Sequence, residues 1–280
     1  MMRRERWTIE TLPWDRFDAT KINPEVLKIV KAASLVEYNA HDYAAYLRNV
    51  FADDAMFGRT ADQWAREEVQ HGEALGRWAE RADPNFSFQN AVERYRAGYR
   101  VNVDAKESLR GSPAGELVAR CIVETGTSSY YSALGDAVEE PVLKAICRNV
   151  ASDEFRHYSM FYNRLTEYLQ REGLSRLERL KIGLSRIMET EDDELAYAFY
   201  AANAAPGAPF VRAVYSEAYA VHAYSHYRRQ HVVRVVAMVF KACGLPPNPV
   251  WQGIASKAAW WLMRQKAKPR RAAANARKAA

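Results

Sequence analysis

Two segments of the sequence carry the same spacing of a carboxylate and an imidazole. Glu68 and His71 lie three residues apart in WAREEVQHGEAL, and Glu154 and His157 lie three residues apart in ASDEFRHYSMFY. Residues at this spacing share one face of a helix, so each pair presents an oxygen and a nitrogen to the same point. The apolar residues around both pairs predict that these faces are buried. Because buried, ionised carboxylates need compensating charge, the two segments restrict the chain to a fold that encloses a polar site between helices.

A glutamate on a preceding helix accompanies each segment. Glu37 precedes the first segment by nearly the same number of residues as Glu124 precedes the second, as a duplicated helical hairpin would require. One Glu from each of two helices and a Glu-x-x-His from each of two others is the ligand pattern of bundles that hold two redox metal ions. Taken singly, each residue is explained by hydrogen bonding in the core. The doubled pattern favours a site for two irons, with manganese as the alternative metal, and six ligands: Glu37, Glu68, His71, Glu124, Glu154 and His157.

Helix-capping signals divide most of the chain into helices. Asn23-Pro24 marks a helix start, Thr60 with Gln63 predicts a capping box, and Gly173 marks a helix end. No segment shows the alternation of a strand. The expected helices span residues 24–52, 60–82, 87–100, 112–138, 141–172, 175–189, 191–203, 209–243 and 249–266. We therefore expect an all-α fold with one domain over residues 1–266, a ligand bundle over 24–172 and a basic disordered tail over 267–280.

The charge balance bears on partners and location. The chain has 40 Lys and Arg against 34 Asp and Glu, and its net charge is +6. A solvated basic tail is the simpler interpretation, and contact with an acidic protein or anionic lipid is the alternative. Nucleic acid is not expected, because no aromatic residues alternate with the basic ones of the tail. The chain lacks a signal-peptide pattern and a bilayer-spanning segment, which favours a cytoplasmic location.

Three segments resemble a known family. WAREEVQHGEAL, ETGTSSYYSAL and ASDEFRHYSMFY are similar to the ligand helices of the ferritin-like di-iron oxidases, and nearest to the acyl-[acyl-carrier-protein] desaturases with their W-x-x-E-E-x-x-H-G and D-E-x-R-H segments. The resemblance covers about residues 24–172. It implies a ferritin-like four-helix bundle with additional C-terminal helices, the same six ligands, and O2-dependent oxidation, above all desaturation, of an aliphatic acyl chain. The implied partners are a ferredoxin-type electron donor and acyl carrier protein or another acyl substrate, and we expect a homodimer.

Three further residues have expected roles near the metals. Thr127 follows Glu124 by three residues, where the desaturases carry a threonine near the oxygen site. Its hydroxyl would relay a proton there, or would only bond to the helix backbone. Asp153 and Glu67 each precede a ligand glutamate. By the pseudo-symmetry of the two halves, Asp153 would accept the distal N–H of His71, and Glu67 that of His157. Exposure to solvent, or ion pairs with Arg66 or Arg156, is the alternative.

The resemblance does not extend beyond about residue 174, and the roles of this region stay open. His222, His226 and His231 lie on the expected 209–243 helix, and the four-residue spacing of His222 and His226 would allow a second metal. Tyr215 and Tyr219 continue the same stripe, so aromatic packing is favoured. One face of the last helix carries apolar residues, for which core packing is favoured over contact with a membrane surface or a carrier protein. These residues are Trp251, Ile254, Ala258 and Trp261.

Two other classes of function share the ligand pattern. One is another di-iron oxygenase, such as an amine N-oxygenase or an aldehyde-deformylating enzyme. The other is iron handling by a ferroxidase or storage subunit. Storage is disfavoured by the long extension beyond the four ligand helices and by the basic charge, since cage subunits are compact bundles.

Overall fold

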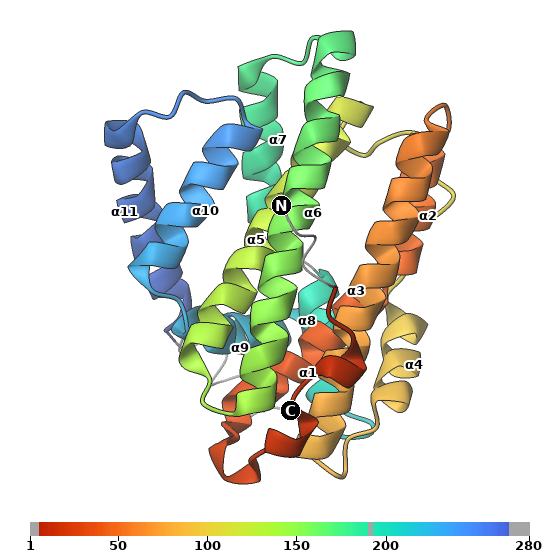
Figure 1. Ribbon diagram of the computed structural model, residues 1–280, viewed down its shortest axis with the longest axis vertical. Coiled ribbons are helices and arrows are strands. Elements are labelled where there is room, and N and C mark those ends of the chain that lie inside the picture. The colour runs from red at the N-terminus through yellow and green to blue at the C-terminus, as the bar shows by residue number, and fades with distance from the viewer. Residues whose placement is uncertain (1–5, 190–192, 269–280) are drawn as a thin grey trace.

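The computed structural model describes residues 6–189 and 193–268, and every regular element in these ranges is a helix (Figure 1). The all-α expectation is confirmed. Three short 3-10 helices, Ile9–Thr11, Trp14–Arg16 and Ala19–Lys21, come before the α-helices. The α-helices are α1 (Pro24–Tyr38), α2 (Ala40–Val50), α3 (Ala55–Ala82), α4 (Phe88–Gly98), α5 (Pro113–Ala137), α6 (Pro141–Glu172), α7 (Arg176–Glu189), α8 (Asp193–Asn203), α9 (Arg212–Ser225), α10 (Arg229–Ala242) and α11 (Pro249–Lys266).

Two pairs of helices form the centre of the molecule. α5 packs along α6, α1 packs along α3, and α3 also contacts α6. Their apolar side chains form two separate buried clusters, one containing Leu75 and Leu134 and the other containing Leu117 and Phe161. The six candidate ligands lie between the stretches of α3, α5 and α6 that supply these clusters. A polar layer therefore divides the apolar core.

The remaining helices surround this centre. α2 and α4 lie on one side, next to α3, and α10 lies on the opposite side against α5, with α11 outside it (Figure 1). α8 packs against α1 and α9 packs against α8. The site is thus covered by protein on several sides, and the peripheral helices do not supply its candidate ligands.

Several expected helix boundaries are confirmed by their caps. Asn23 accepts a hydrogen bond from the backbone N–H of Glu25 at 2.9 Å, and Pro24 begins α1. Such a cap satisfies backbone donors that have no partner within the helix. Ser112 caps α5 in the same way. Gly173 ends α6 with a φ of 67°, in the left-handed region that glycine adopts without steric cost.

Two expected long helices are each broken into two. The 24–52 helix breaks at Asn39, which has φ −85° and ψ 5° and separates α1 from α2. The amide of the Asn39 side chain is buried and makes no hydrogen bond, so the break is seen in the backbone alone, where the N–H of Asn39 donates to the carbonyl of Val36, three residues back, at 3.2 Å. The 209–243 helix breaks between Ser225 and Arg229. There the backbone N–H of Arg228 donates to Nδ1 of His231 at 3.0 Å, which starts α10 anew.

The capping box expected at Thr60 is wrong. α3 begins earlier, at Ala55, because Asp54 accepts a hydrogen bond from the backbone N–H of Phe57 at 3.0 Å. The hydroxyl of Thr60 instead donates to the carbonyl of Met56 at 3.0 Å, inside the helix. Asp54 also contacts α6 through Arg164 and through the hydroxyl of Tyr168 at 3.0 Å. Tertiary contacts therefore select the helix start here.

The expectation that the last helix packs its apolar face into the core is also wrong. Trp251 and Trp261 are 62% and 61% exposed, and Ile254 and Ala258 are exposed as well.

The described helices include none with the length and hydropathy needed to cross a membrane. Residues 267 and 268 end the described part of the chain, so the predicted basic tail lies outside it from residue 269 on.

Candidate metal centre

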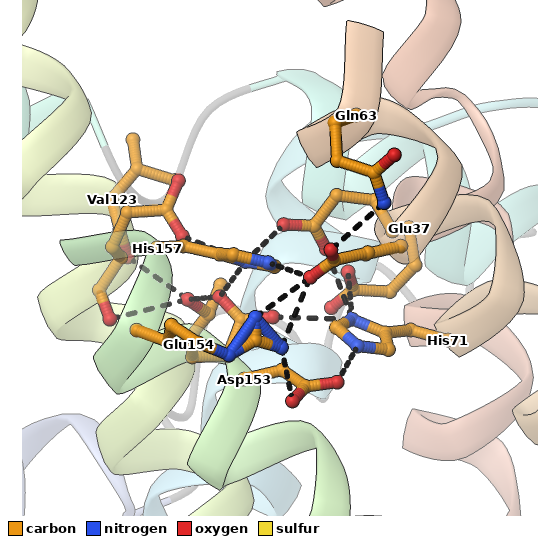
Figure 2. Close-up of polar contacts among 12 residues, drawn as sticks. Glu37, Gln63, His71, Val123, Asp153, Glu154 and His157 are labelled. Carbon is orange, nitrogen blue, oxygen red and sulfur yellow. Dashed lines mark hydrogen bonds and ion pairs between the residues drawn. The ribbon is translucent and has the colours of Figure 1, made fainter. Parts of the chain in front are cut away.

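The structure brings the six candidate ligands together in the polar layer between the two apolar clusters. They come from four helices: Glu37 from α1, Glu68 and His71 from α3, Glu124 from α5, and the Glu154/His157 pair from α6. All six side chains are buried. Figure 2 shows His157 and His71 reaching toward one another from opposite sides, and their ring centroids lie 5.9 Å apart.

The ligands form two groups of four that share two glutamates. Each group offers oxygen and nitrogen atoms that lie within 4.8 Å of one another. The first group is Glu37, Glu68, His71 and Glu154, and the second is Glu68, Glu124, Glu154 and His157. Glu68 and Glu154 belong to both groups. Two adjacent cations with two shared carboxylates match this arrangement.

A close approach of α1 and α3 brings Glu37 to the centre. A Cβ at Gly72 would lie 2.6 Å from the backbone nitrogen of Tyr38 and 2.8 Å from the carbonyl oxygen of Ser34. Only glycine allows this contact. It places Oε2 of Glu37 3.8 Å from Nδ1 of His71. The glycine that follows the ligand histidine therefore permits the packing of the site.

Without a cation, the buried charges compensate one another only in part. Burial, together with the charge of Glu68, raises the pKa of Glu37 well above its usual range, and burial with the charge of Glu154 does the same for Glu124. For Glu68, burial is outweighed by the close contacts with the His157 and His71 rings and by their charges, so its pKa is held well below the usual range. Burial of these carboxylates thus favours a positive charge among them.

The two histidines have raised pKa values in the metal-free protein. Burial alone would lower the pKa of each ring. It is outweighed at His71 by hydrogen bonds to carboxylates, Asp153 foremost, and at His157 by the charge of Glu68 and the hydrogen bond to Glu67. The pKa of His157 rises to about 9. Metal binding would release these protons, because a bound imidazole must give up the proton on its coordinating nitrogen.

The residues present fit a pair of divalent cations. Three buried atoms of the cluster have no hydrogen-bond partner: Oε2 of Glu124, Oε1 of Glu154 and Nδ1 of His157. Nδ1 of His157 lies 2.9 Å from Oε1 of Glu68, at ion-pair distance but outside hydrogen-bond geometry. Buried polar atoms without partners are rare in folded proteins. Cations at the two groups would give all three atoms a partner.

Acidic neighbours contact the outer nitrogens of both histidines. Nε2 of His71 lies 3.1 Å from Oδ2 of Asp153, and Nε2 of His157 lies 3.0 Å from Oε2 of Glu67. These are the pairings expected from the pseudo-symmetry. Arg156 also pairs with both acids, so the alternative ion pair is present at the same time. Nδ1 of each histidine is thereby left facing the ligand cluster.

Thr127 lies beside the ligand set. Its hydroxyl donates to Oε2 of Glu154 at 2.6 Å and lies 3.3 Å from the backbone carbonyls of Val123 and Glu124. The carboxylate contact is the shortest, and the backbone contacts are also present. At Gly126, a Cβ would meet no atom within 4 Å, so this glycine is not needed for close packing.

Sequence reasoning missed two residues that contact the cluster. Trp7 donates from Nε1 to Oδ2 of Asp153 at 2.8 Å and stacks on His71 with ring centroids 5.9 Å apart. It precedes the first predicted helix, so no periodicity pointed to it. Tyr131 donates to Oε1 of Glu37 at 2.6 Å. It lies on the same face of α5 as Glu124, two turns later, which was a usable signal.

The later histidines do not form a second metal site. Nε2 of His222 lies 2.9 Å from a carboxylate oxygen of Glu25, and Nε2 of His231 lies 3.0 Å from Asp136. The helix break also separates His226 from α10. Within the described part of the chain, the two groups above are the only clusters with the geometry of a metal site.

Comparisons with known proteins do not assign the chain to a family. No family model and no curated protein matches it. Its chemistry therefore has to be inferred from the six buried side chains and their surroundings.

Proposed function

We propose that the protein is a di-iron, O2-dependent oxidase with a ferritin-like four-helix bundle, acting on an aliphatic acyl chain as a desaturase does. One observation carries the proposal: two groups of buried carboxylate and imidazole ligands share Glu68 and Glu154. That ligand pattern is the one found in ferritin-like carboxylate bundles.

Iron suits these ligands better than most other metals. Soft metals favour thiolates, and the three cysteines at 121, 147 and 243 lie outside both groups. Magnesium and calcium favour oxygen alone. Mixed carboxylate and imidazole ligands suit iron, and manganese is the alternative. When bound, a pair of irons would supply the redox chemistry that oxidises an unactivated C–H bond with dioxygen.

The residues around the ligands would orient the two histidines, hold a proton beside the site and exclude water from it. Asp153 and Glu67 hold the outer nitrogens of the two histidines, which fixes the nitrogen that faces the metals. The hydroxyl of Thr127 holds a proton next to Glu154. The two apolar clusters on either side keep the layer dry, which strengthens every interaction within it.

The acyl substrate and the partners follow from the resemblance and from the charge. A ferredoxin-type protein would deliver electrons, and the acyl chain would arrive on acyl carrier protein or in another form. A net charge of +6 would speed encounter with acidic partners. The alternatives are an amine N-oxygenase, an aldehyde-deformylating enzyme and a ferroxidase.

Metal content tests the proposal. Elemental analysis of the purified protein should give two irons per chain, and Glu68→Ala or His157→Ala should lose much of this metal. Glu73→Ala is the matched control, because Glu73 is exposed on the same helix. Unchanged metal in both ligand variants would refute the site.

Two further experiments separate the candidate functions. Oxygen uptake measured with an acyl chain, an arylamine or an aldehyde distinguishes the oxidase reactions, and a very large particle in gel filtration would indicate an iron-storage cage.

A further inference from the structure

A buried arginine without a counter-ion lies one helical turn from the metal cluster. Arg120 is on α5, four residues before Glu124, and is only 7% exposed. Its Nε has no hydrogen-bond partner, and no ion pair joins its guanidinium to any described residue. Arginine stays charged at every physiological pH. A buried charge is normally paired, so this position lacks an anion.

The groups that surround Arg120 are aromatic. Its guanidinium carbon lies 5.2 Å from the ring centroid of Tyr43 and 5.9 Å from that of Trp64. Ring faces stabilise a cation without neutralising it. Trp64 is 5% exposed, and its Nε1 also lacks a hydrogen-bond partner. Two neighbouring buried donors therefore have no acceptor.

The nearby carboxylates have other partners. Glu116, one turn before Arg120, accepts from the hydroxyls of Tyr46 at 2.8 Å and Ser108 at 2.9 Å. Glu194 accepts from the hydroxyls of Tyr43 at 2.6 Å and Tyr95 at 2.9 Å. Burial raises the pKa of Glu194, while the hydrogen bonds from both tyrosines and the charges of Arg186 and Arg120 act against this rise. Glu124 belongs to the metal cluster. None of these acids forms an ion pair with Arg120, although its charge acts to lower the pKa of Glu194 and of Glu124.

We propose that Arg120 and Trp64 bind the carboxylate of the substrate, so that the substrate is a free carboxylic acid. The planar fork of arginine matches a carboxylate with two parallel hydrogen bonds, and the indole N–H supplies a third. This inference rests on the proposed oxidase function, and it identifies which form of acyl chain enters. An acyl group on a carrier protein is a neutral thioester, which cannot compensate the charge of Arg120.

The position of the pair sets the orientation of the substrate. Arg120 precedes Glu124 by one turn on α5, and Trp64, whose ring it contacts, precedes Glu68 by one turn on α3. Four residues correspond to a rise of about 6 Å along a helix. A carboxylate held here would bring the first carbons of its chain beside the metal ligands. Binding energy from the carboxylate would then position the reacting carbons.

Ligand binding to the purified protein tests this site without relying on turnover. Tryptophan fluorescence and calorimetry would compare butanoate, octanoate and hexadecanoate with the methyl ester of each acid. At least one carboxylate should bind tenfold or more tightly than its ester, since hydrogen bonds to charged groups contribute at least this much. Equal binding of the acids and the esters would overturn the proposal, as would no binding of any of the acids.

Variants separate recognition from a purely structural role. Arg120→Gln should weaken carboxylate binding at least tenfold, and Trp64→Phe, which keeps an aromatic ring but removes the N–H, should weaken it several-fold. Arg148→Gln is the control, because Arg148 is exposed on α6. Unchanged affinity in Trp64→Phe and Arg120→Gln would mean that both residues only pack the core. If Arg120→Gln does not fold, Arg120→Lys, which keeps the charge but loses the fork, takes its place.

Metal analysis of the same samples distinguishes this inference from the proposed function. Two irons per chain with no preference for the acid over the ester would overturn the carboxylate site alone. Selective carboxylate binding by a protein that takes up no iron would overturn the oxidase function and leave an acid-binding protein.

Discussion

At the scale of single residues, the site depends on contacts outside its ligands. Asp153 accepts from Trp7 and contacts His71, and Tyr131 donates to Glu37. The contacts of Asp153 with His71 and of Tyr131 with Glu37 orient two ligands, and Trp7 in turn holds Asp153. Changes to these neighbours should therefore alter metal affinity while the ligands remain in place.

Asp153→Asn should weaken metal binding by roughly 10–100-fold, because partners of ligand histidines commonly contribute this much. The amide keeps the shape of the carboxylate but loses its negative charge, so the His71 ring loses its oriented partner. Competition with a chromogenic chelator would measure the affinity, with Glu73→Gln as the control on the surface. Equal affinities in Asp153→Asn and wild type would show that the contact does not orient the ligand.

Thr127→Val should retain both metals but slow the reaction of the reduced protein with oxygen. Valine has nearly the volume of threonine but has no hydroxyl to hold a proton beside Glu154. Stopped-flow absorbance after mixing with oxygen would measure the rate, and elemental analysis would confirm the metal content. Identical kinetics would show that the hydroxyl serves only its neighbours in the helix.

At the scale of helices, two contacts position the ligand faces. Gly72 allows α3 to approach α1 next to Glu37. Asp54 joins the start of α3 to α6 through Arg164. The first contact depends on the lack of a side chain at Gly72, and the second depends on an ion pair. Mutation of the first should therefore cause overpacking, and mutation of the second should have an effect on stability that depends on pH.

Gly72→Ala should lower the free energy of unfolding by about 1–3 kcal/mol, the usual cost of overpacking. The added methyl would lie against the backbone of Tyr38, which cannot move independently of its helix. Gly126→Ala is the matched control, since its Cβ meets open space; it should stabilise α5 by up to about 1 kcal/mol. Urea unfolding of both variants measures the difference. Similar values for the two would contradict the close approach.

Asp54→Ala should destabilise the fold by about 2 kcal/mol or more at neutral pH, because a helix cap and a buried ion pair are lost together. The difference should depend on pH. Burial alone would raise the pKa of Asp54, but the hydrogen bond and charge of Arg164 outweigh it, so its pKa lies below the usual value.

A lowered pKa in the folded state means that the carboxylate stabilises the fold fully above its unfolded pKa of about 3.9. This contribution is lost as the pH falls through the lower folded value. The difference between wild type and Asp54→Ala in urea unfolding should therefore be constant above about pH 5 and shrink below about pH 4. A difference that grows on acidification would contradict this pairing.

At the scale of the whole molecule, the polar layer crosses the core between two apolar clusters. It contains two histidines and two carboxyl groups, Glu37 and Glu124, whose pKa values are raised. The stability of the entire fold should therefore be linked to metal.

Iron at about a hundredfold excess over its Kd should add about 2.7 kcal/mol to the free energy of unfolding. For a chain of this size, that raises Tm by roughly 5–10 °C. Because the ligands must lose protons to bind, the gain should fall as the pH is lowered. Calorimetry with and without a chelator, over a series of pH values, measures both effects. A Tm that does not respond to iron would contradict a metal site in the core.

Local sequence patterns determined much of this protein. The three-residue spacing put Glu68 with His71, and Glu154 with His157, on single helix faces, and the caps at Asn23, Ser112 and Gly173 marked true helix boundaries. These are properties of one helix at a time, because side-chain direction and backbone hydrogen bonds repeat along its own axis.

The tertiary structure alone decided how those faces meet. It made Glu68 and Glu154 common to both groups, placed Trp7 against His71, and left α11 exposed instead of in the core. It also moved the start of α3 to Ala55, because the cap Asp54 is held by partners on α6. The shared glutamates, the position of Trp7 and the exposure of α11 have no local signal, because each depends on residues far apart in sequence that come together only when the helices pack. Asp54 has a local signal as a helix cap, and its partners on α6 select it over Thr60.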